Sequence, residues 1–185
     1  MYQKKGILTT LKQISVEDAE DIVTLRNDEK FNKFLYQHPL TIQEQIQWIQ
    51  SKQGLQNEVN FKVLDIHNDF VGTISIYNIQ NGHGEFGRYI VKKPINAIES
   101  ELLLLKFCFE DLRMKSIYCN TNTNNVNVWN QHTKLGFKYI DKVIEYVGSS
   151  ADIEVEAIRQ EISFKDYTSF NYDSIYQLIN KFTLR

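Results

Sequence analysis

Residues 97–112 predict a helix that is apolar on nearly every side, because the segment ELLLLKFCFEDL fills its middle with aliphatic and aromatic side chains. Such a helix cannot lie on a surface with one face in water, so it must be covered from several directions. Its longest apolar run, residues 102–105, is far shorter than the ~20 residues that a membrane-spanning helix requires. The chain is therefore expected to fold as a globular domain with this helix in its core.

The segments around this helix alternate between strand and helix patterns. Two capping boxes, Ser15 with Asp18 and Thr41 with Glu44, each precede a run of apolar residues at helical spacing. The first run includes the later residues Phe31, Phe34 and Leu35. Residues 67–69 form a turn signal between two strand patterns and indicate a hairpin. Strands are predicted at residues 7–11, 61–66, 70–77, 85–91, 116–120, 137–147 and 152–164, and further helices at 125–134 and 173–182. This order predicts a mixed sheet covered by helices, an α/β or α+β domain.

Charge, composition and missing motifs disfavour several classes of function. Lys and Arg number 21 against 23 Asp and Glu, a net charge of −2, whereas nucleic-acid-binding domains are usually basic. The 4 His are scattered without a Cys partner at ligand spacing, so no metal site is expected. Neither GxSxG nor GxxxxGK[ST] occurs, which disfavours that hydrolase design and a P-loop.

The two cysteines, Cys108 and Cys119, lie in apolar runs and form no CxxC pair. They are expected to be buried reduced thiols, as in a cytoplasmic protein. The opening residues do not resemble a signal peptide, because polar residues interrupt the short apolar stretch behind them. We therefore expect a cytoplasmic protein with no membrane and no nucleic-acid partner.

Three motifs, taken in order along the chain, resemble those of one enzyme family. Residues 70–77 (FVGTISIY) carry a Gly after an apolar pair, and residues 85–90 (EFGRYI) form a further strand. Residues 125–137 (NVNVWNQHTKLGF) are similar to the helix pattern N-x-x-A-x-x-L-Y-x-K-x-G-F. Over residues 7–164 the chain thus resembles the GNAT acetyltransferases, which transfer an acetyl group from acetyl-CoA to an amine.

This resemblance implies an architecture and a division of the chain. The GNAT sheet is mixed, mostly antiparallel and twisted, and six to seven strands flanked by about four helices are expected here, plus a short C-terminal helix. Residues 1–164 would form the GNAT domain. Residues 165–185 would form an extension whose helix packs on the domain or on a partner subunit, which leaves a homodimer open.

The resemblance also narrows the acceptor. Residues 25–29 (LRNDE), followed by the Thr41-capped helix with Gln45 and Trp48, look like the branch that contains nucleotide-amino-sugar N-acetyltransferases. Direct transfer from acetyl-CoA to a primary amine of a small molecule is therefore expected, with an amino-sugar nucleotide as the leading acceptor. Two alternatives stay open: a ribosomal-protein-type N-terminal acetyltransferase and a non-catalytic GNAT-fold binding module.

Acetyl-CoA is expected to lie along one strand and on the loop behind it. The expected contacts are the backbone of Tyr89, Ile90 and Val91, the loop residues Asn96, Ala97, Ile98, Glu99 and Ser100, and Asn125 and Trp129 of the late helix. The loop departs from the family pattern R/Q-x-x-G-x-G/A because it has no Gly. Glu99 is expected to compete with pyrophosphate for the free N–H groups at the helix N-terminus, with Lys92 and Lys93 offsetting its charge.

Two residues are the candidates for proton transfer. Glu85 is the candidate general base, directly or through a water molecule, with His83 in the preceding turn as its rival. His132 stands where the family often has a Tyr that is thought to act as general acid toward the CoA sulfur, and an imidazolium can donate a proton in the same way. Tyr118 and Tyr139 are fallback donors, otherwise core aromatics.

The acceptor site is expected on the first helices and the central strands. Arg26 suits a phosphate or a carboxylate, because its guanidinium donates two parallel hydrogen bonds. Trp48 suits stacking on a sugar or a base. Asn27, Tyr77 and Arg88 complete the expected acceptor wall, and no metal cofactor is expected.

Overall fold

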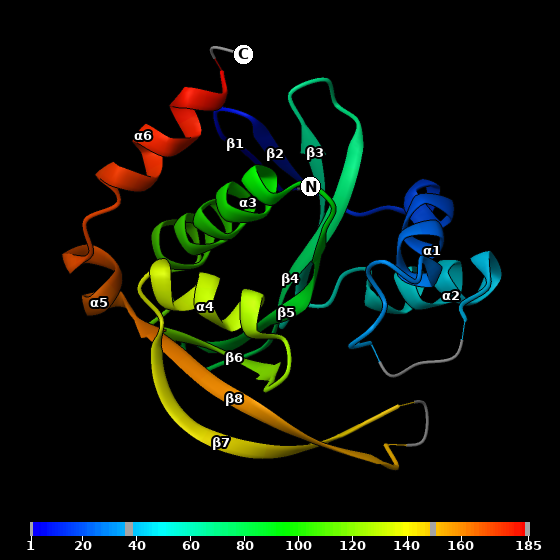
Figure 1. Ribbon diagram of the computed structural model, residues 1–185. Coiled ribbons are helices and arrows are strands. Elements are labelled where there is room, and N and C mark those ends of the chain that lie inside the picture. Colours follow the sequence, from blue (N-terminus) through cyan, green and yellow to red (C-terminus); the bar gives the residue numbers. More distant parts are fainter. Residues whose placement is uncertain (1, 36–38, 149–150, 184–185) are drawn as a thin grey trace.

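The computed structural model describes residues 2–35, 39–148 and 151–183. Within these residues one eight-stranded sheet runs through the molecule in the order β1-β2-β3-β4-β5-β6-β8-β7 (Figure 1). The strands are β1 (Gln3–Lys5), β2 (Thr9–Gln13), β3 (Val59–Asp65), β4 (Phe70–Gln80), β5 (His83–Val91), β6 (Ser116–Asn122), β7 (Lys138–Val147) and β8 (Ile153–Ser163). The mixed, mostly antiparallel sheet is confirmed, and it is slightly larger than the six to seven strands predicted.

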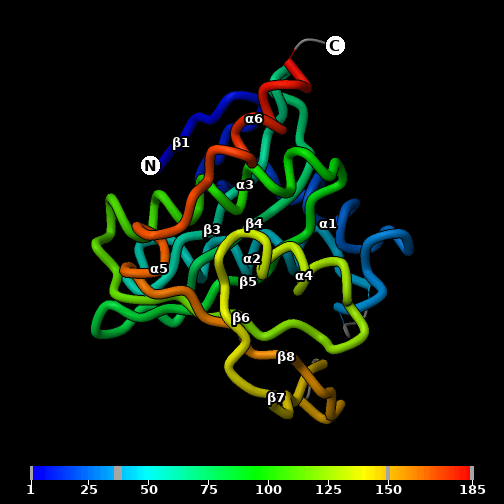
Figure 2. Tube along the Cα trace, turned by 60° about the vertical axis from the view of Figure 1, so that its left-hand side comes forward, coloured from blue at the N-terminus to red at the C-terminus, as the bar shows by residue number. Residues whose placement is uncertain are grey.

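Helices cover both faces of this sheet. The helices are α1 (Ala19–Asn27), α2 (Ile42–Lys52), α3 (Pro94–Lys106), α4 (Val126–Lys134), α5 (Phe164–Ser169) and α6 (Asp173–Phe182), with a short 3-10 helix η1 (Val16–Asp18) and a π-helical turn η2 (Phe107–Asp111). Helices α1 and α2 lie apart from α3 and α4, on the opposite face of the central strands (Figures 1 and 2). The sheet therefore separates the molecule into two sides.

The only parallel pairing among the described strands joins β5 to β6, and it is short. It runs from His83 opposite Ser116 to Glu85 opposite Tyr118. Beyond that point β5 stays with β4, whereas β6 continues beside β8. The two central strands therefore diverge in the middle of the sheet.

β5 changes direction at Arg88. This residue has a φ of 48°, a left-handed conformation that is uncommon for a side chain other than glycine. The register between β4 and β5 shifts between Thr73 and Ser75, which pairs with Gly87, and again between Tyr77 and Gln80. Such a bulge bends a strand and re-aims its side chains.

The core lies mainly between the sheet and α3, as the apolar helix predicted. Phe61, Phe107, Phe109 and Phe137 are among the largest fully buried side chains. A smaller cluster of Ala19, Ile22 and Ile49 holds α1 and α2 against the other face.

Several local predictions are confirmed. The capping boxes of Ser15 with Asp18 and of Thr41 with Glu44 are both present. The β3–β4 hairpin turns at residues 66–69, and α6 has the predicted bounds. Both cysteines are buried and free.

Other local predictions are wrong in their bounds. The strand predicted at residues 7–11 corresponds to β2, which covers Thr9–Gln13, and the sequence analysis did not predict β1 or α5. The helical spacing of Phe31, Phe34 and Leu35 is not realised, because α1 ends at Asn27. The long apolar helix begins three residues earlier, at Pro94, and gives way to the π-helical turn η2 after Lys106.

The C-terminal segment packs back on the domain. Ile179 of α6 is fully buried in a cluster with Leu8, Leu102 and Leu135. The Tyr172 hydroxyl donates a hydrogen bond to the Leu135 carbonyl at 3.2 Å. No helix among the described residues is long and apolar enough to cross a membrane.

Candidate functional site

A cavity of about 640 Å³ opens where β5 and β6 diverge. Its walls come from both strands, from the first turn of α3, from α4 and from the segment that follows α1. The lining residues include 86–91 of β5, 119–122 of β6, Pro94 and Ala97 of α3, Asn125, Asn127, Val128, Gln131 and His132 at α4, and Lys30, Phe31, Lys33, Phe34 and Leu35.

The first turn of α3 offers backbone donors at the edge of this cavity. Pro94 opens the helix, and the first bond of the turn runs from the Ala97 N–H to the Lys93 carbonyl at 2.9 Å. The N–H groups of Ile95 and Asn96 precede that bond and have no intrahelical acceptor. None of residues 92–99 has a positive φ, so this turn does not require glycine. It fits a pyrophosphate through free amides and the positive end of the helix dipole.

The prediction that Glu99 opposes a pyrophosphate is wrong. Its side chain is 2% exposed and points toward the β1–β2 loop. There its two oxygens accept hydrogen bonds from the N–H groups of Ile7 at 2.5 Å and Leu8 at 2.8 Å. The carboxylate is thus turned away from the first turn of α3 because it satisfies buried backbone donors elsewhere.

Two neighbours of Glu99 also turn into the protein. The Asn96 side chain donates to the Leu8 carbonyl at 3.1 Å and to Thr9 Oγ1 at 2.9 Å. The Ser100 hydroxyl donates to the Ala97 carbonyl at 2.8 Å. Of the five predicted loop residues, Ala97 alone lines the cavity.

The cations of this region are arranged differently from the prediction. Lys93 Nζ lies 2.6 Å from Asp65 Oδ2 in β3, and Lys92 Nζ lies over the Phe70 ring of β4. Both lysines are therefore engaged with the β3–β4 hairpin. Lys30 and Lys33, which the sequence argument missed, line the cavity instead.

His132 lines the same cavity and forms a buried pair with Glu101. The Nδ1 atom of His132 lies 2.8 Å from Glu101 Oε1, and the two side chains are 2% and 0% exposed. The ring of His132 also packs against Phe86 and Phe137, with centroids 5.0 and 5.6 Å away. Glu101 was missed, although an acid inside a helix that is apolar all round is itself a signal of a buried partner.

Glu85 lies on the opposite side of the sheet, in a polar cluster. Its carboxylate accepts hydrogen bonds from the Tyr77 hydroxyl at 2.9 Å, the Asn78 amide at 2.9 Å and the Tyr118 hydroxyl at 3.3 Å. Burial, then the charge of Glu85, raises the pKa of Tyr77 and of Tyr118. Both phenols therefore stay protonated and can donate.

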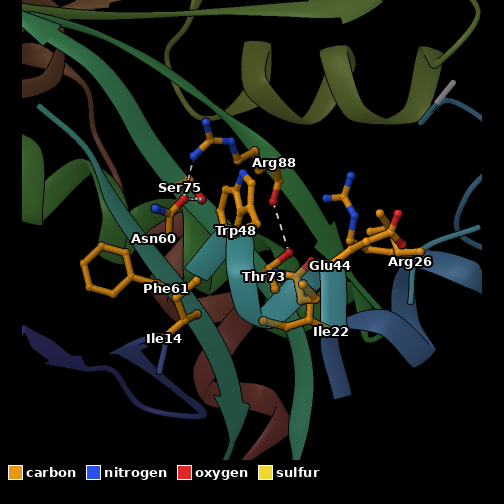
Figure 3. A pocket seen from close by; sticks show the side chains of 12 residues that line it. Ile14, Ile22, Arg26, Glu44, Trp48, Asn60, Phe61, Thr73, Ser75 and Arg88 are labelled. Carbon is orange, nitrogen blue, oxygen red and sulfur yellow. Dashed lines mark hydrogen bonds between the residues drawn. The ribbon is translucent and has the colours of Figure 1, made fainter. Parts of the chain in front are cut away.

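A second cavity, of about 340 Å³, lies between α1, α2 and the central strands. Figure 3 shows the Trp48 ring beside Arg88, with Arg26 and Glu44 across the space. The lining residues are Ile14, Ile22, Arg26, Leu40, Glu44, Gln45, Trp48, Asn60, Phe61, Thr73, Ser75 and Arg88. Arg88 lines both this cavity and the larger one, so one residue of β5 borders the two spaces.

The side chain of Arg88 is held on several sides. Its guanidinium lies 4.3 Å from the Tyr77 ring centroid and 5.0 Å from that of Trp48. Nη1 donates to Asn60 Oδ1 at 2.8 Å and to Glu58 Oε1 at 3.1 Å. Burial raises the pKa of Glu58, but hydrogen bonds from Asn60 and the nearby Arg88 outweigh it and lower that pKa.

Arg26 brings a second guanidinium to the smaller cavity. Its burial, followed by the charge of Arg88, lowers its pKa to about 10. The two arginines therefore repel each other in a partly desolvated space. An anionic ligand between them would relieve that repulsion.

Several predicted residues lie outside both cavities. Asn27 closes the segment after α1, because its side chain exchanges two 2.8 Å hydrogen bonds with the backbone of Leu40. Trp129 donates to the Thr123 carbonyl at 3.2 Å, and His83 lies beside Ser116 Oγ at 2.8 Å. Tyr139 is 59% exposed, so its prediction as a core aromatic is wrong.

The family model for the acetyltransferase (GNAT) domain matches residues 9–138, which include β2 to α4 and both cavities. The chain belongs to the GNAT acetyltransferase family. Its members are acetyl-CoA-dependent N-acetyltransferases. A search of the curated proteins found no match.

Solved GNAT structures share the fold. The apo form of FdhC, a nucleotide-linked sugar GNAT, has a TM-score of 0.78 at 23% identity, covering 95% of this chain and 97% of that one. Spermidine N-acetyltransferase from Vibrio cholerae, in complex with CoA and spermine, has a TM-score of 0.75 at 18% identity, with 88% and 99% covered. A GNAT acetyltransferase from Bacillus anthracis has a TM-score of 0.75 at 16% identity, with 89% and 99% covered.

The chemistry of the larger cavity fits the CoA part of a GNAT cosubstrate. Residues 86–91 of β5 line it, Pro94 and Ala97 bring the first turn of α3 to it, and Lys30 and Lys33 add positive charge. No group of His, Cys, Asp and Glu side chains in the described part of the chain could hold a metal ion.

Proposed function

We propose that this GNAT enzyme transfers the acetyl group of acetyl-CoA directly to a primary amine of a small anionic acceptor, with an amino-sugar nucleotide as the leading class. One observation carries the proposal. Arg88 of β5 lines two cavities, one beside α1 and α2 and the other between β5 and β6. One can hold the cosubstrate and the other the acceptor.

The backbone of Tyr89, Ile90 and Val91 would bind the pantetheine arm, and the first turn of α3 near Ala97 would bind the pyrophosphate. Asn125 would lie near the cofactor at the start of α4, where its side chain makes no capping hydrogen bond. When bound, acetyl-CoA supplies the acetyl thioester. Holding both reactants together accounts for a large share of the rate in such reactions.

The charge of the smaller cavity supports an anionic acceptor. Arg26 and Arg88 both line it, and Trp48 offers an aromatic surface of the kind that stacks on a sugar or a base. A polyamine would bring several positive charges toward two half-buried guanidinium groups. Glu58, the acid nearest to Arg88, is already engaged by that arginine and by Lys52.

Glu85 would receive the proton that the acceptor amine loses. Its carboxylate lines neither cavity, but the Tyr77 hydroxyl, which donates to it, lies against Gly87 at the wall of the larger one. The Tyr77 hydroxyl would then pass the amine proton to Glu85. Relay through a hydroxyl places a base within reach without exposing its charge.

The alternative of a non-catalytic binding module loses its main support. That alternative rested on repulsion between Glu99 and a pyrophosphate, and the Glu99 carboxylate is turned away. The alternative of an N-terminal peptide acetyltransferase would require an open, acid-lined groove, whereas the smaller cavity is lined by one acid, Glu44, beside Arg26 and Arg88.

Two measurements test the proposal. Thermal melts with CoA and acetyl-CoA should raise the melting temperature, because a ligand that binds only the folded state stabilises it by RT ln(1 + [L]/Kd). Release of free CoA thiol should then be followed with amino-sugar nucleotides, spermidine and a peptide N-terminus as acceptors. Turnover of the sugar nucleotides at least tenfold above the other two supports the proposal, and preference for spermidine or the peptide contradicts it.

A further inference from the structure

The buried pair of Glu101 and His132 belongs to a longer chain of hydrogen bonds. The bond at one end of this chain, from Tyr89 to Ala97, determines which group donates and which accepts in the bonds that follow. The Tyr89 hydroxyl donates to the Ala97 carbonyl at 2.8 Å. A carbonyl oxygen can only accept, so the proton of the hydroxyl is committed to it. The Tyr89 oxygen must then accept from Gln131 Nε2, which lies 2.6 Å away.

The same amide nitrogen reaches Glu101. Gln131 Nε2 lies 2.9 Å from Glu101 Oε2, so the two protons of this nitrogen go to Tyr89 and to Glu101. One carboxylate oxygen is thereby an acceptor. The other, Oε1, faces His132 Nδ1 at 2.8 Å. An ionised carboxylate has no proton to give, so Nδ1 carries the proton between them.

We propose that Glu101 is a positioning residue that fixes the proton of His132 on Nδ1 and so directs Nε2 to the cavity between β5 and β6. This inference rests on the proposed function, in which that cavity holds the CoA arm. A buried carboxylate that holds one ring nitrogen of a histidine sets both the tautomer and the orientation of the ring.

The role of the pair follows from the proton balance of acetyl transfer. When the amine forms its bond to the acetyl carbon, the carbon–sulfur bond breaks and its electron pair goes to sulfur. A His132 imidazolium can give the Nε2 proton to that sulfur, and the ring remains neutral with its proton on Nδ1. The negative charge of Glu101 stabilises the imidazolium before the transfer.

Other titratable groups near the pair do not compete for this proton. Tyr89 of β5 and Cys119 of β6 face it, and burial, followed by the charge of Glu101, raises the pKa of both. Tyr172 lies in the segment before α6, and its pKa is also raised, first by burial, then by Tyr176 and then by Glu101. All three groups therefore stay neutral near pH 7.

The test uses ¹⁵N-histidine NMR of the full chain, with the His132 signals assigned by their loss in His132→Gln. In the wild type, Nδ1 of His132 should keep its proton, and Nε2 should be the nitrogen that carries the lone pair once the imidazolium has given up a proton. In Glu101→Gln, the new amide oxygen must accept from Gln131, so its NH₂ group faces Nδ1 and the proton should move to Nε2. A wild-type ring with its proton on Nε2, or an unchanged tautomer in Glu101→Gln, overturns the proposal.

A matched control separates position from stability. Glu99→Gln also removes a buried carboxylate from α3, but one that accepts from Ile7 and Leu8 instead of His132. It should lower the melting temperature and leave the His132 tautomer unchanged. Addition of CoA should shift the Nε2 signal of His132 in the wild type, and no shift at saturating CoA contradicts the placement of Nε2 in the CoA cavity.

Kinetics supply the last readout. Glu101→Gln should lower kcat at least tenfold and leave KM for acetyl-CoA within about twofold. In a His132→Tyr background the same substitution should change neither value further, because no imidazole is left to position. An equal loss in both backgrounds would assign Glu101 a purely structural role. If the wild type acetylates no amine, the proposed function fails, and the NMR result still decides the tautomer.

Discussion

The hydroxyl of Tyr77 lies between the carboxylate of Glu85 and the backbone of Gly87. The hydroxyl donates to Glu85 Oε1 at 2.9 Å. A Cβ atom built on Gly87 would lie 2.5 Å from the Tyr77 hydroxyl oxygen. Gly87 belongs to the wall of the larger cavity, so this arrangement links the cavity to a base on the far side of the strand.

Replacement of Gly87 by Ala should therefore displace the Tyr77 hydroxyl. The expected result is a tenfold or greater loss of kcat together with a lower melting temperature, because overpacking costs about 1–3 kcal/mol. The double variant Gly87→Ala/Tyr77→Phe removes the colliding oxygen. It should recover most of the stability and none of the activity, and recovery of both would contradict the relay.

Glu85→Gln should lower kcat by about 100-fold, in the range that general base catalysis contributes. Tyr77→Phe should produce a loss of similar size because it interrupts the same proton path. Steady-state kinetics of the double variant provide the check. If the two losses add in full, Glu85 and Tyr77 act independently and the relay is wrong.

The buried Glu99 leads to a prediction about stability instead of binding. Glu99→Ala leaves the N–H groups of Ile7 and Leu8 without their acceptors, and each unsatisfied buried group costs about 1–3 kcal/mol. Urea unfolding should show a loss of that order per group. The Kd for CoA, measured by calorimetry, should stay within about threefold of the wild-type value. A marked gain in CoA affinity would instead support repulsion between Glu99 and the pyrophosphate.

The two arginines of the smaller cavity should control the acceptor. Arg26→Ala should raise KM for an anionic acceptor at least tenfold and leave KM for acetyl-CoA nearly unchanged, since Arg26 lines only the smaller cavity. Arg26→Lys keeps the charge but loses bidentate donation, so its KM for the acceptor should lie between the values of the wild type and of Arg26→Ala. A KM for the acceptor that is insensitive to both substitutions would remove Arg26 from the site.

Glu58 should contribute to a stability that depends on pH. Its folded-state pKa lies below the ordinary value of 4.5, so the folded protein favours the ionised form more than the unfolded chain does. The resulting stabilisation is complete above about pH 4.5 and is lost as the pH falls through the folded-state pKa. The difference in unfolding free energy between wild type and Glu58→Gln, measured by urea titration, should therefore shrink from pH 7 to pH 3. A constant difference would contradict the assignment.

The sequence predicted those parts of the fold that depend on local spacing. Capping boxes at Ser15 and Thr41, the hairpin before Phe70 and the amphipathic α6 all result from contacts between residues close in the chain. Three motifs in order along the chain, the last from Asn125 to Phe137, together indicated the family. The helical pattern at Phe31 to Leu35 failed, because spacing alone does not show whether an apolar face has a surface to pack against.

The direction of polar side chains could not be predicted from the sequence. The sequence places Glu99 and Glu101 two residues apart on one helix, but it does not show which hydrogen-bond donors each carboxylate meets. Only the tertiary structure brings the backbone of Ile7 and Leu8 to one and His132 to the other. These partners lie 31 to 92 residues away in the chain, and a buried carboxylate is defined by the donors that the fold supplies to it.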